Sequence, residues 1–428
     1  MTAITSTRAL RVVQLNHADL QGGGAAIAGF RLHRALHESG RVQSSMCVGG
    51  KASTDEDVRE LAHPALARKL IRKVGRELGL NELDGIGAYR LGDASDVRAA
   101  DVLHFHAIHG GWFSYPAMVR LTAATPSVMT LHDMWAFTGH CSYSLECERW
   151  RSGCGSCPHP EMFPAIRRDA TRIEWRVKDA VWARSKLVIV SPSRWLAGLA
   201  TDSTLGRFPV RIIPLGIDTA TFAPRAPDVA RHALGIPEDR TVILFAAAFL
   251  GGTTAGSLTG SRKGADLLME VLRRVPPEQR ATCTLLLMGS SSPDMTALLR
   301  ALDYDVVDVG YVASDELKSI VYSAADVFVC PTKADNSPLV IIESIACGTP
   351  VLSFAVGGVA ELVRPGVTGA LAPAGDVGAM TRRLVELLDD PGALAAMRST
   401  CRAVAEREHA NAIAVERHIA LYEELADR

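Results

Sequence analysis

Short apolar runs alternate along the chain with stretches in which apolar positions recur every three or four residues. The short runs, rich in Val, Leu and Ile, are typical of strands buried on both faces of a parallel sheet, and the longer spacing indicates helices. Predicted strands in the first half are 10–15, 42–48, 101–105, 127–131 and 186–190, with helices between them such as 25–39 and 116–122. Predicted strands in the second half are 241–246, 283–288, 306–309, 327–330 and 351–354. This order predicts parallel sheets with right-handed crossovers.

A segment containing proline and glycine, 201–218, interrupts the alternation near the middle of the chain. We place a domain boundary there, which predicts an α/β protein with two Rossmann-like, doubly wound parallel-sheet domains, 1–208 and 209–400. Residues 401–428 are rich in Ala, Glu and Arg and predict a C-terminal helix that packs back on the first domain. Two sheets facing each other leave a cleft, where ligands usually bind.

Composition and charge exclude several classes of protein. The 46 basic and 47 acidic side chains give a formal net charge of −1, which argues against a nucleic-acid partner. The sequence contains no apolar run near the roughly 20 residues of a membrane span, and its start indicates a strand and loop rather than a signal peptide. We therefore expect a cytoplasmic protein whose cysteines are thiols or metal ligands.

The segment from Asp335 to Glu343 carries the most informative chemistry. Asp335 follows a predicted strand, and Glu343 lies eight positions later in a helix that begins near Pro338. Carboxylates accept hydrogen bonds from the hydroxyls of a polyol, and the N–H groups of a helix N-terminus bind an oxyanion. An Asp cap followed by one exposed Glu fits the spacing equally well.

Together with 347–351 and 356–358, this segment resembles the donor-site signature of GT-B glycosyltransferases, in particular glycosyltransferase family 4, which usually has Glu at both ends of the spacing. The resemblance implies the GT-B fold, with an acceptor-binding N-terminal domain and a C-terminal domain that binds a UDP- or GDP-sugar. Glu343 would hold the ribose hydroxyls and Asp335 the sugar hydroxyls. The other implied donor contacts come from the intervening segment: Asn336, Ser337, Pro338 and Leu339.

Two cations, Arg262 and Lys263, end a Gly/Ser/Thr-rich loop, 251–261, and precede a helix. Cations beside a helix N-terminus suit a diphosphate, although a solvated basic loop end is the simpler interpretation. In the resembling family, the Lys-Gly pair at this place grips the pyrophosphate. The family implies a retaining transfer in which these cations stabilise the leaving diphosphate, so we expect no catalytic metal.

In the first half, the glycine cluster with Gly23 and Gly24 precedes a helix and lets a ligand approach the backbone, unless it is a plain tight turn. The resemblance places it near the donor phosphates. His132 and Asp133 follow a predicted strand. The family position of His132 contacts the transferred sugar, and Asp133 would orient it or contact the acceptor. We therefore predict His132, Asp133 and Asp335 as the catalytic group, and interpret His104 and His109 as structural.

Four cysteines, Cys141, Cys147, Cys154 and Cys157, lie within 17 residues. The closing Cys-x2-Cys pair favours a structural zinc site, with unliganded thiols or disulfides as the alternatives. The stretch 132–141, with these cysteines, resembles a family 4 branch of bacterial exopolysaccharide gene products of the colanic-acid type. This resemblance implies that the loop shapes the acceptor side.

Residues 64–80 predict an amphipathic helix with one basic side, which suits either peripheral contact with the inner membrane face or ordinary packing on the sheet. The predicted function is thus a retaining hexosyltransferase that moves a sugar from a nucleotide-sugar to a hydroxyl of a glycan, a lipid-linked glycan or a small molecule. The alternatives are a nucleotide-sugar epimerase of the same fold and a non-enzymatic, zinc-stabilised binding module.

Overall fold

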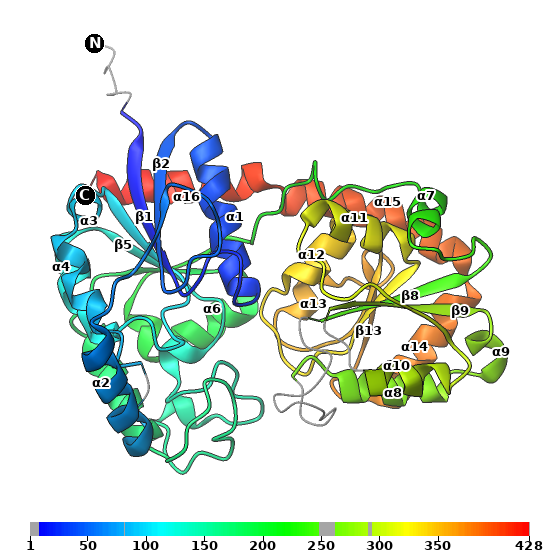
Figure 1. The fold of residues 1–428 in the computed structure, drawn as a ribbon, viewed down its shortest axis with the longest axis horizontal. Coiled ribbons are helices and arrows are strands. Elements are labelled where there is room, and N and C mark those ends of the chain that lie inside the picture. The colour runs from blue at the N-terminus through cyan, green and yellow to red at the C-terminus, as the bar shows by residue number, and fades with distance from the viewer. Residues whose placement is uncertain (1–7, 81, 248–261, 290–292, 428) are drawn as a thin grey trace. The chain divides into compact units, whose positions relative to one another are not determined.

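The structure is a computed structural model of the chain that describes residues 8–80, 82–247, 262–289 and 293–427. It divides into two compact units (Figure 1). The first comprises Met1–Gly216 and Asn411–Arg428, and the second comprises Ile217–Ala410. The predicted glycine-rich loop 251–261 lies outside the described residues.

The first unit contains a seven-stranded parallel sheet in the order β3-β2-β1-β4-β5-β6-β7. Its strands are β1 (Leu10–Asn16), β2 (Val42–Val48), β3 (Val58–Glu60), β4 (Val102–Phe105), β5 (Ser127–Thr130), β6 (Val188–Ser191) and β7 (Val210–Ile212). Its helices are α1 (Gly24–Glu38), α2 (Ala65–Leu78), α3 (Ser95–Arg98), α4 (Met118–Ala124), α5 (Thr171–Trp182), α6 (Arg194–Thr201) and α16 (Asn411–Ala426). Short 3-10 turns cover Ile86–Asp93, Tyr115–Ala117, Trp135–Phe137, Arg149–Arg151 and Thr204–Arg207.

Both faces of this sheet are covered, so successive strand residues enter different cores. Val13 and Leu15 of β1 pack in the core that contains Trp182 of α5, whereas Val12 packs in the core formed with α1 and α16. Helix α16 lies beside α1 (Figure 1), and its Tyr422 side chain is fully buried. The C-terminal helix therefore completes one face of the first unit.

The second unit contains a six-stranded parallel sheet in the order β10-β9-β8-β11-β12-β13. Its strands are β8 (Thr241–Ala247), β9 (Cys283–Gly289), β10 (Asp305–Asp308), β11 (Val327–Cys330), β12 (Val351–Phe354) and β13 (Gly369–Ala372). Its helices are α7 (Pro227–Ala233), α8 (Ala265–Arg274), α9 (Pro277–Arg280), α10 (Pro293–Arg300), α11 (Asp315–Ala324), α12 (Leu339–Ala346), α13 (Val359–Leu362), α14 (Val377–Asp389) and α15 (Pro391–Glu408). Helices α8 and α14 lie along one face of this sheet and α11 and α12 along the other (Figure 1).

Each sheet reverses its strand order once, between β1 and β4 in the first unit and between β8 and β11 in the second. Ligands of doubly wound folds bind at the carboxyl ends of the strands at such reversals. The predicted α/β fold with two doubly wound parallel sheets is confirmed. Among the described residues, no helix combines the length and the apolar character needed to cross a bilayer.

Candidate functional site

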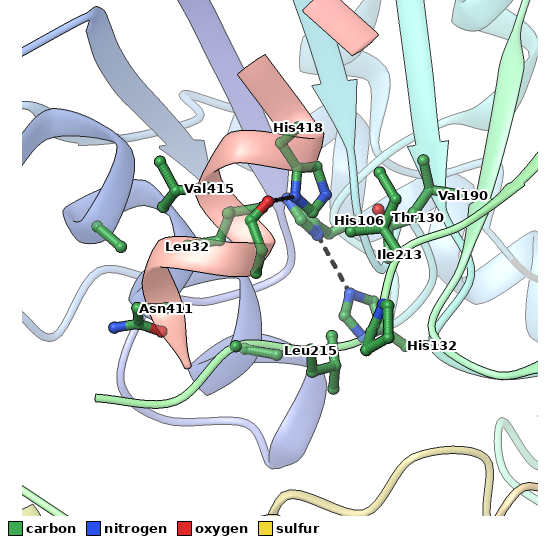
Figure 2. Close-up of a pocket in the computed structure, with 15 residues that line it drawn as sticks. Leu32, His106, Thr130, His132, Val190, Ile213, Leu215, Asn411, Val415 and His418 are labelled. Atoms are coloured by element: carbon green, nitrogen blue, oxygen red, sulfur yellow. Dashed lines mark hydrogen bonds between the residues drawn. The ribbon is translucent and has the colours of Figure 1, made fainter. Parts of the chain in front are cut away.

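The first candidate site lies at the carboxyl ends of β4 and β5. His132 and Asp133 follow β5 after one intervening residue, and His106 directly follows β4. His106 Nδ1 lies 3.1 Å from His132 Nε2 (Figure 2), and His106 Nε2 lies 2.9 Å from Gln14 Oε1. Burial lowers the pKa of His132 to about 4 and that of His106 well below its usual value. Both imidazoles are therefore neutral at pH 7.

A charged pair lies beside these neutral rings. His109 Nε2 lies 3.0 Å from Asp133 Oδ2, and the Trp135 N–H donates to Asp133 Oδ1 at 2.9 Å. Burial alone would lower the pKa of His109, but Asp133 raises it above its usual value. Burial likewise opposes ionisation of Asp133, yet His109 lowers the pKa of that carboxyl. His109, interpreted from sequence as structural, thus bonds a predicted catalytic residue.

His132 also lines a small cavity of about 20 Å³. Figure 2 draws the residues that surround it. Its polar lining residues are His106, Thr130, His132, Asn411 and His418, and the other lining residues are apolar or glycine. A space of this size holds about one water molecule rather than a sugar. The cavity therefore belongs to the packing around His132 and does not accommodate a substrate.

The glycine loop before α1 adopts conformations that favour glycine. Gly22 has φ 118° and Gly23 has φ 91°. A Cβ at Gly22 would lie 2.6 Å from His17 Nε2, whereas a Cβ at Gly23 or Gly24 would meet no atom within 4 Å. The backbone at Gly23 and Gly24 is therefore exposed and open to a ligand, as the predicted role requires.

The second candidate site follows β11. Lys263 Nζ donates to Asp335 Oδ2 at 2.7 Å, and Arg262 Nη1 donates to the same oxygen at 3.0 Å. Asp335 is 7% exposed. Burial would raise the pKa of Asp335, but the two cations hold it well below its usual range. The three predicted donor-site residues thus form one ionic cluster, in which the carboxylate is buried and the two cations are partly exposed.

Gly264 positions the two cations. It has φ 75°, and a Cβ there would lie 1.9 Å from the Pro331 carbonyl oxygen. Only glycine lets the 262–264 turn approach the segment after β11 this closely. The Lys333 N–H donates to the Arg262 carbonyl at 2.8 Å and fixes the same contact.

Helix α12 carries Glu343, which is 4% exposed. Tyr322 of α11 donates its hydroxyl to Glu343 Oε2 at 2.9 Å. The segment before the helix includes the buried Asn336, whose N–H donates to Asp335 Oδ1 at 3.0 Å. The segment from Asn336 through Ser337 and Pro338 to Leu339 therefore leads from the ionic cluster directly into the helix that carries Glu343.

The four clustered cysteines are free thiols in the structure. The Gly139 N–H lies 3.2 Å from Cys154 Sγ, and His140 Nε2 lies 3.3 Å from Cys157 Sγ. Within the described ranges no three His, Cys, Asp or Glu side chains form a group that could hold a metal ion. Structural zinc at Cys141, Cys147, Cys154 and Cys157 stays a prediction. Stoichiometric zinc in chelator-washed, reduced protein would support it, and substoichiometric zinc would contradict it.

Helix α2 presents its apolar side outward. Leu70 is 66% exposed, Val74 49% and Leu78 48%. Two of the basic residues on the other side turn inward: Arg68 donates to the Gly111 carbonyl at 2.8 Å, and Arg72 donates to Asp84 at 2.8 Å. The side chains of Leu70, Val74 and Leu78 therefore do not hold α2 on the sheet.

Two family models match successive parts of the chain. The model described as Glycosyltransferase Family 4 matches residues 22–221, and the model described as Glycosyl transferases group 1 matches residues 252–390. The putative colanic acid biosynthesis glycosyl transferase WcaC of Escherichia coli (strain K12) is 26% identical over 370 residues, covering 80% of this chain and 83% of that protein. A D-inositol 3-phosphate glycosyltransferase of Mycolicibacterium smegmatis is 26% identical over 413 residues, covering 92% of this chain and 86% of that protein.

Solved structures share the architecture. Sucrose-phosphate synthase from Thermosynechococcus elongatus superposes with a TM-score of 0.69 at 22% identity, covering 97% of this chain and 99% of the other. Anabaena HepE in complex with UDP gives a TM-score of 0.65 at 17% identity, covering 97% and 100%. At these identities the likeness concerns the fold alone.

Proposed function

Because the chain belongs to the GT-B glycosyltransferases, with a family 4 region followed by a group 1 region, we propose that it is a retaining enzyme that moves a sugar from a nucleotide-sugar to a hydroxyl acceptor. The observation that carries this proposal is the cluster of Arg262, Lys263 and Asp335. A diphosphate brings more negative charge than one carboxylate and competes for both cations. Its binding would release Asp335 to accept hydrogen bonds from the sugar.

The proposed donor is a UDP-sugar, with a GDP-sugar as the alternative. The Anabaena neighbour was solved with UDP, which supports testing that nucleotide first. We assign the ribose hydroxyls to Glu343, whose carboxylate is already oriented by Tyr322. Backbone N–H groups between Asn336 and Leu339 are assigned to the sugar or the phosphates.

In the proposed reaction, the acceptor oxygen bonds to the anomeric carbon on the face from which the diphosphate leaves, and the diphosphate takes the acceptor proton. Lys263 and Arg262 stabilise the charge that develops on the leaving group, so the proposal needs no catalytic metal. His132 hydrogen-bonds a sugar hydroxyl as a neutral imidazole. Asp133, paired with His109, orients it or contacts the acceptor.

A panel of UDP-, GDP- and dTDP-sugars tests the donor. A donor that binds the folded state raises its thermal midpoint, and product analysis by NMR then reports the anomeric configuration. Glu343→Ala should abolish both the thermal shift and turnover, whereas Glu316→Ala, at an exposed position on α11, should change neither. Donor isomerisation without transfer, or full turnover by Glu343→Ala, would contradict the proposal.

We also propose that α2 contacts an anionic membrane, which would suit a lipid-linked acceptor. Its three exposed apolar residues lie beside the exposed Lys69 and Lys73. Such a surface inserts into the interface and attracts anionic lipid. Phosphatidylglycerol vesicles should co-sediment the wild type more than phosphatidylcholine vesicles do.

A matched pair of variants tests that surface. Leu70→Gln together with Val74→Gln should abolish sedimentation with phosphatidylglycerol vesicles. Val229→Gln, which replaces a 65% exposed residue on α7, should leave it unchanged. Equal binding by both variants would contradict a role for α2.

A further inference from the structure

Phe163 presents its aromatic ring to solvent, although hydrogen bonds fix the backbone around it. The side chain is 60% exposed, and Phe163 is the only exposed phenylalanine among those that the structure describes. Its carbonyl accepts from the Ser142 N–H at 2.8 Å, and the Ser142 carbonyl accepts from the Met134 N–H at 2.9 Å. The next residue, Pro164, is buried, and its carbonyl oxygen lies 2.9 Å from His140 Nδ1. The fold therefore holds this ring out of the apolar core.

The Phe163 ring lies beside the ion pair of the first candidate site. Its centroid is 5.7 Å from that of the His109 ring, and the two ring planes are inclined by 72°. His109 Nε2 in turn lies 3.0 Å from Asp133 Oδ2. One imidazole ring therefore separates the exposed aromatic ring from a carboxylate that the sequence predicts as part of the catalytic group.

The same imidazole also adjoins the glycine loop before α1. The ring of His17 lies nearly parallel to that of His109, with 6.4 Å between the centroids and 17° between the planes. His17 Nε2 lies 2.9 Å from the Gly22 carbonyl oxygen. A group bound on Phe163 would therefore be close to the loop that is predicted to lie beside the donor phosphates.

Asp133 can bind a hydroxyl group beside this ring. Burial opposes its ionisation, but His109 lowers the pKa of the carboxyl, which is therefore charged at neutral pH. Its two oxygens accept from the Trp135 N–H and face His109 Nε2, and an ionised carboxylate offers about four acceptor positions. The Asp133 side chain is 15% exposed. The carboxylate thus has both the capacity and the access to accept from a ligand hydroxyl.

An exposed aromatic ring near an ionised carboxylate suits a sugar. The C–H groups on one face of a pyranose carry partial positive charge and pack on the negative face of an aromatic ring, and the hydroxyls donate to a carboxylate. We propose that Phe163 is the platform on which a pyranose ring of the acceptor packs, with one hydroxyl bonded to Asp133. That the bound sugar is the acceptor rests on the proposed function, whereas the binding of a pyranoside does not.

The consequence concerns the class of acceptor. An acyclic polyol offers the same hydroxyls, but it has no rigid C–H face and must lose conformational freedom to form one. The fixed backbone around Phe163 favours a ligand that is rigid as well. We therefore expect the acceptor to be a glycan or a lipid-linked glycan that ends in a pyranose, and not an acyclic alcohol.

Saturation-transfer difference NMR of the full-length protein tests the platform without a donor. The ligands are the methyl pyranosides of glucose, galactose, mannose, fucose and glucuronic acid, with glucitol as the acyclic comparison. At least one pyranoside should bind the wild type, with the strongest saturation on the C–H groups of one face, and glucitol should not displace it. Failure of every pyranoside to bind, or equal binding of glucitol, would overturn the proposal.

Variants of Phe163 separate a stacking ring from a simple apolar contact. Phe163→Leu keeps an apolar side chain without an aromatic face, and it should weaken pyranoside binding by about 2–10-fold, the usual contribution of an aromatic contact. Phe163→Trp should retain the binding. Tyr311→Leu, which removes a 62% exposed aromatic ring from the second unit, should leave it unchanged. Equal affinity of Phe163→Leu and the wild type would overturn the proposal.

Transfer assays with the tightest-binding pyranoside as acceptor distinguish acceptor from donor. Phe163→Leu should raise the KM for the pyranoside, and it should leave unchanged both the KM for the nucleotide-sugar and the thermal shift that this donor causes. A raised donor KM with an unchanged pyranoside KM would assign the ring to the donor sugar and overturn the proposal. Pyranoside binding without any glycosyl transfer would count against the proposed function and leave the sugar platform intact.

Discussion

In the first unit the candidate site is built around imidazoles that burial keeps neutral, whereas in the second unit it is built around a buried carboxylate that two cations keep ionised. His132 and His106 lose affinity for protons because the interior disfavours their charged forms. Asp335 resists the same effect because Lys263 and Arg262 lie within hydrogen-bonding distance. Burial therefore opposes the charged form in both places, but at Asp335 the two neighbouring cations outweigh it.

The comparison also separates two kinds of recognition. A neutral imidazole donates on one nitrogen and accepts on the other, so it selects for hydrogen-bond donors or acceptors in a ligand. The cations of an ionic cluster attract anions from many directions and can exchange one anion for another. Such a cluster therefore selects ligands by their negative charge. We expect substitutions in the second unit to act mainly on turnover and those in the first unit mainly on stability and its pH dependence.

Lys263→Ala is expected to have the largest effect. It removes a cation that stabilises the leaving diphosphate, and loss of one such group typically lowers turnover by about 10²–10³-fold. The measurement is kcat/KM for transfer from the preferred donor. Lys333→Ala is the matched control, because Lys333 pairs with Asp266 at 2.6 Å instead of with Asp335. Similar losses in the two lysine variants would contradict a specific role for Lys263.

Asp133→Asn tests the ion pair between Asp133 and His109 in the first-unit site. The variant keeps an oxygen for the Trp135 N–H but leaves His109 without a counter-charge. Removing one partner of a buried pair costs about 3 kcal/mol when the other stays charged, and less here because His109 can release its proton. The folded-state pKa of His109 is raised, so its stabilisation is present below the unfolded value and is lost as pH rises through the folded value.

Urea denaturation at pH 6 and pH 9 measures this difference. The gap in unfolding free energy between wild type and Asp133→Asn should be larger at pH 6 than at pH 9. Asp57→Asn, at an exposed pair with His37, should show no such gap. A gap that is the same at both pH values would show that His109 is not charged in the folded protein.

Gly264→Ala separates backbone strain from steric clash in the second-unit site. Gly264 and Gly235 both have left-handed backbones, with φ 75° and 68°, but only Gly264 faces a backbone atom within 4 Å. Gly235→Ala should cost about 1 kcal/mol from the left-handed conformation alone. Gly264→Ala should cost more and should also lower turnover, because its clash with Pro331 displaces the Arg262–Lys263 turn from Asp335. Equal unfolding free energies and equal turnover would contradict the close approach.

Sequence patterns predicted the central strands because those strands are buried on both faces and therefore consist of continuous apolar runs. They did not predict β3, β7 and β13, which lie at sheet edges. Edge strands are short and partly exposed: β7 is Val-Arg-Ile, with its last two residues exposed. Such segments lack the apolar run that marks a strand.

The site residues were located from motifs, but their partners depend on which strands are neighbours. Nothing in the local sequence joins His109 to Asp133, since the contact requires β4 and β5 to lie side by side. One contact between histidines could have been predicted from the sequence alone. His104 and His106 are two positions apart, so their side chains point to the same face of the sheet. In the structure their rings lie 4.2 Å apart. The orientation of α2 could not be predicted from the sequence either, because it depends on the ion pair between Arg72 and Asp84.

The smallest expected effect concerns His418, the histidine of α16 that lines the cavity in Figure 2. Its Nδ1 lies 2.8 Å from the Ala414 carbonyl, and its buried Nε2 has no hydrogen-bond partner within the described part of the chain. Burial lowers the pKa of His418 to about 4, below the unfolded value near 6.5. The unfolded state therefore binds more protons between these values, and this histidine costs stability as pH falls from about 6.5 to about 4.

His418→Leu removes that titration and keeps an apolar side chain in the core. The free energy of unfolding should change little at pH 7, and the variant should lose about 2 kcal/mol less than the wild type between pH 7 and pH 5. His232→Leu, at an exposed position on α7, should follow the wild-type pH dependence. Parallel acid losses in wild type and His418→Leu would mean that the ring is protonated in the folded state. Burial would then not be what keeps the imidazoles of the first unit neutral, and the contrast with the ionic cluster of the second unit would have to be drawn from geometry alone.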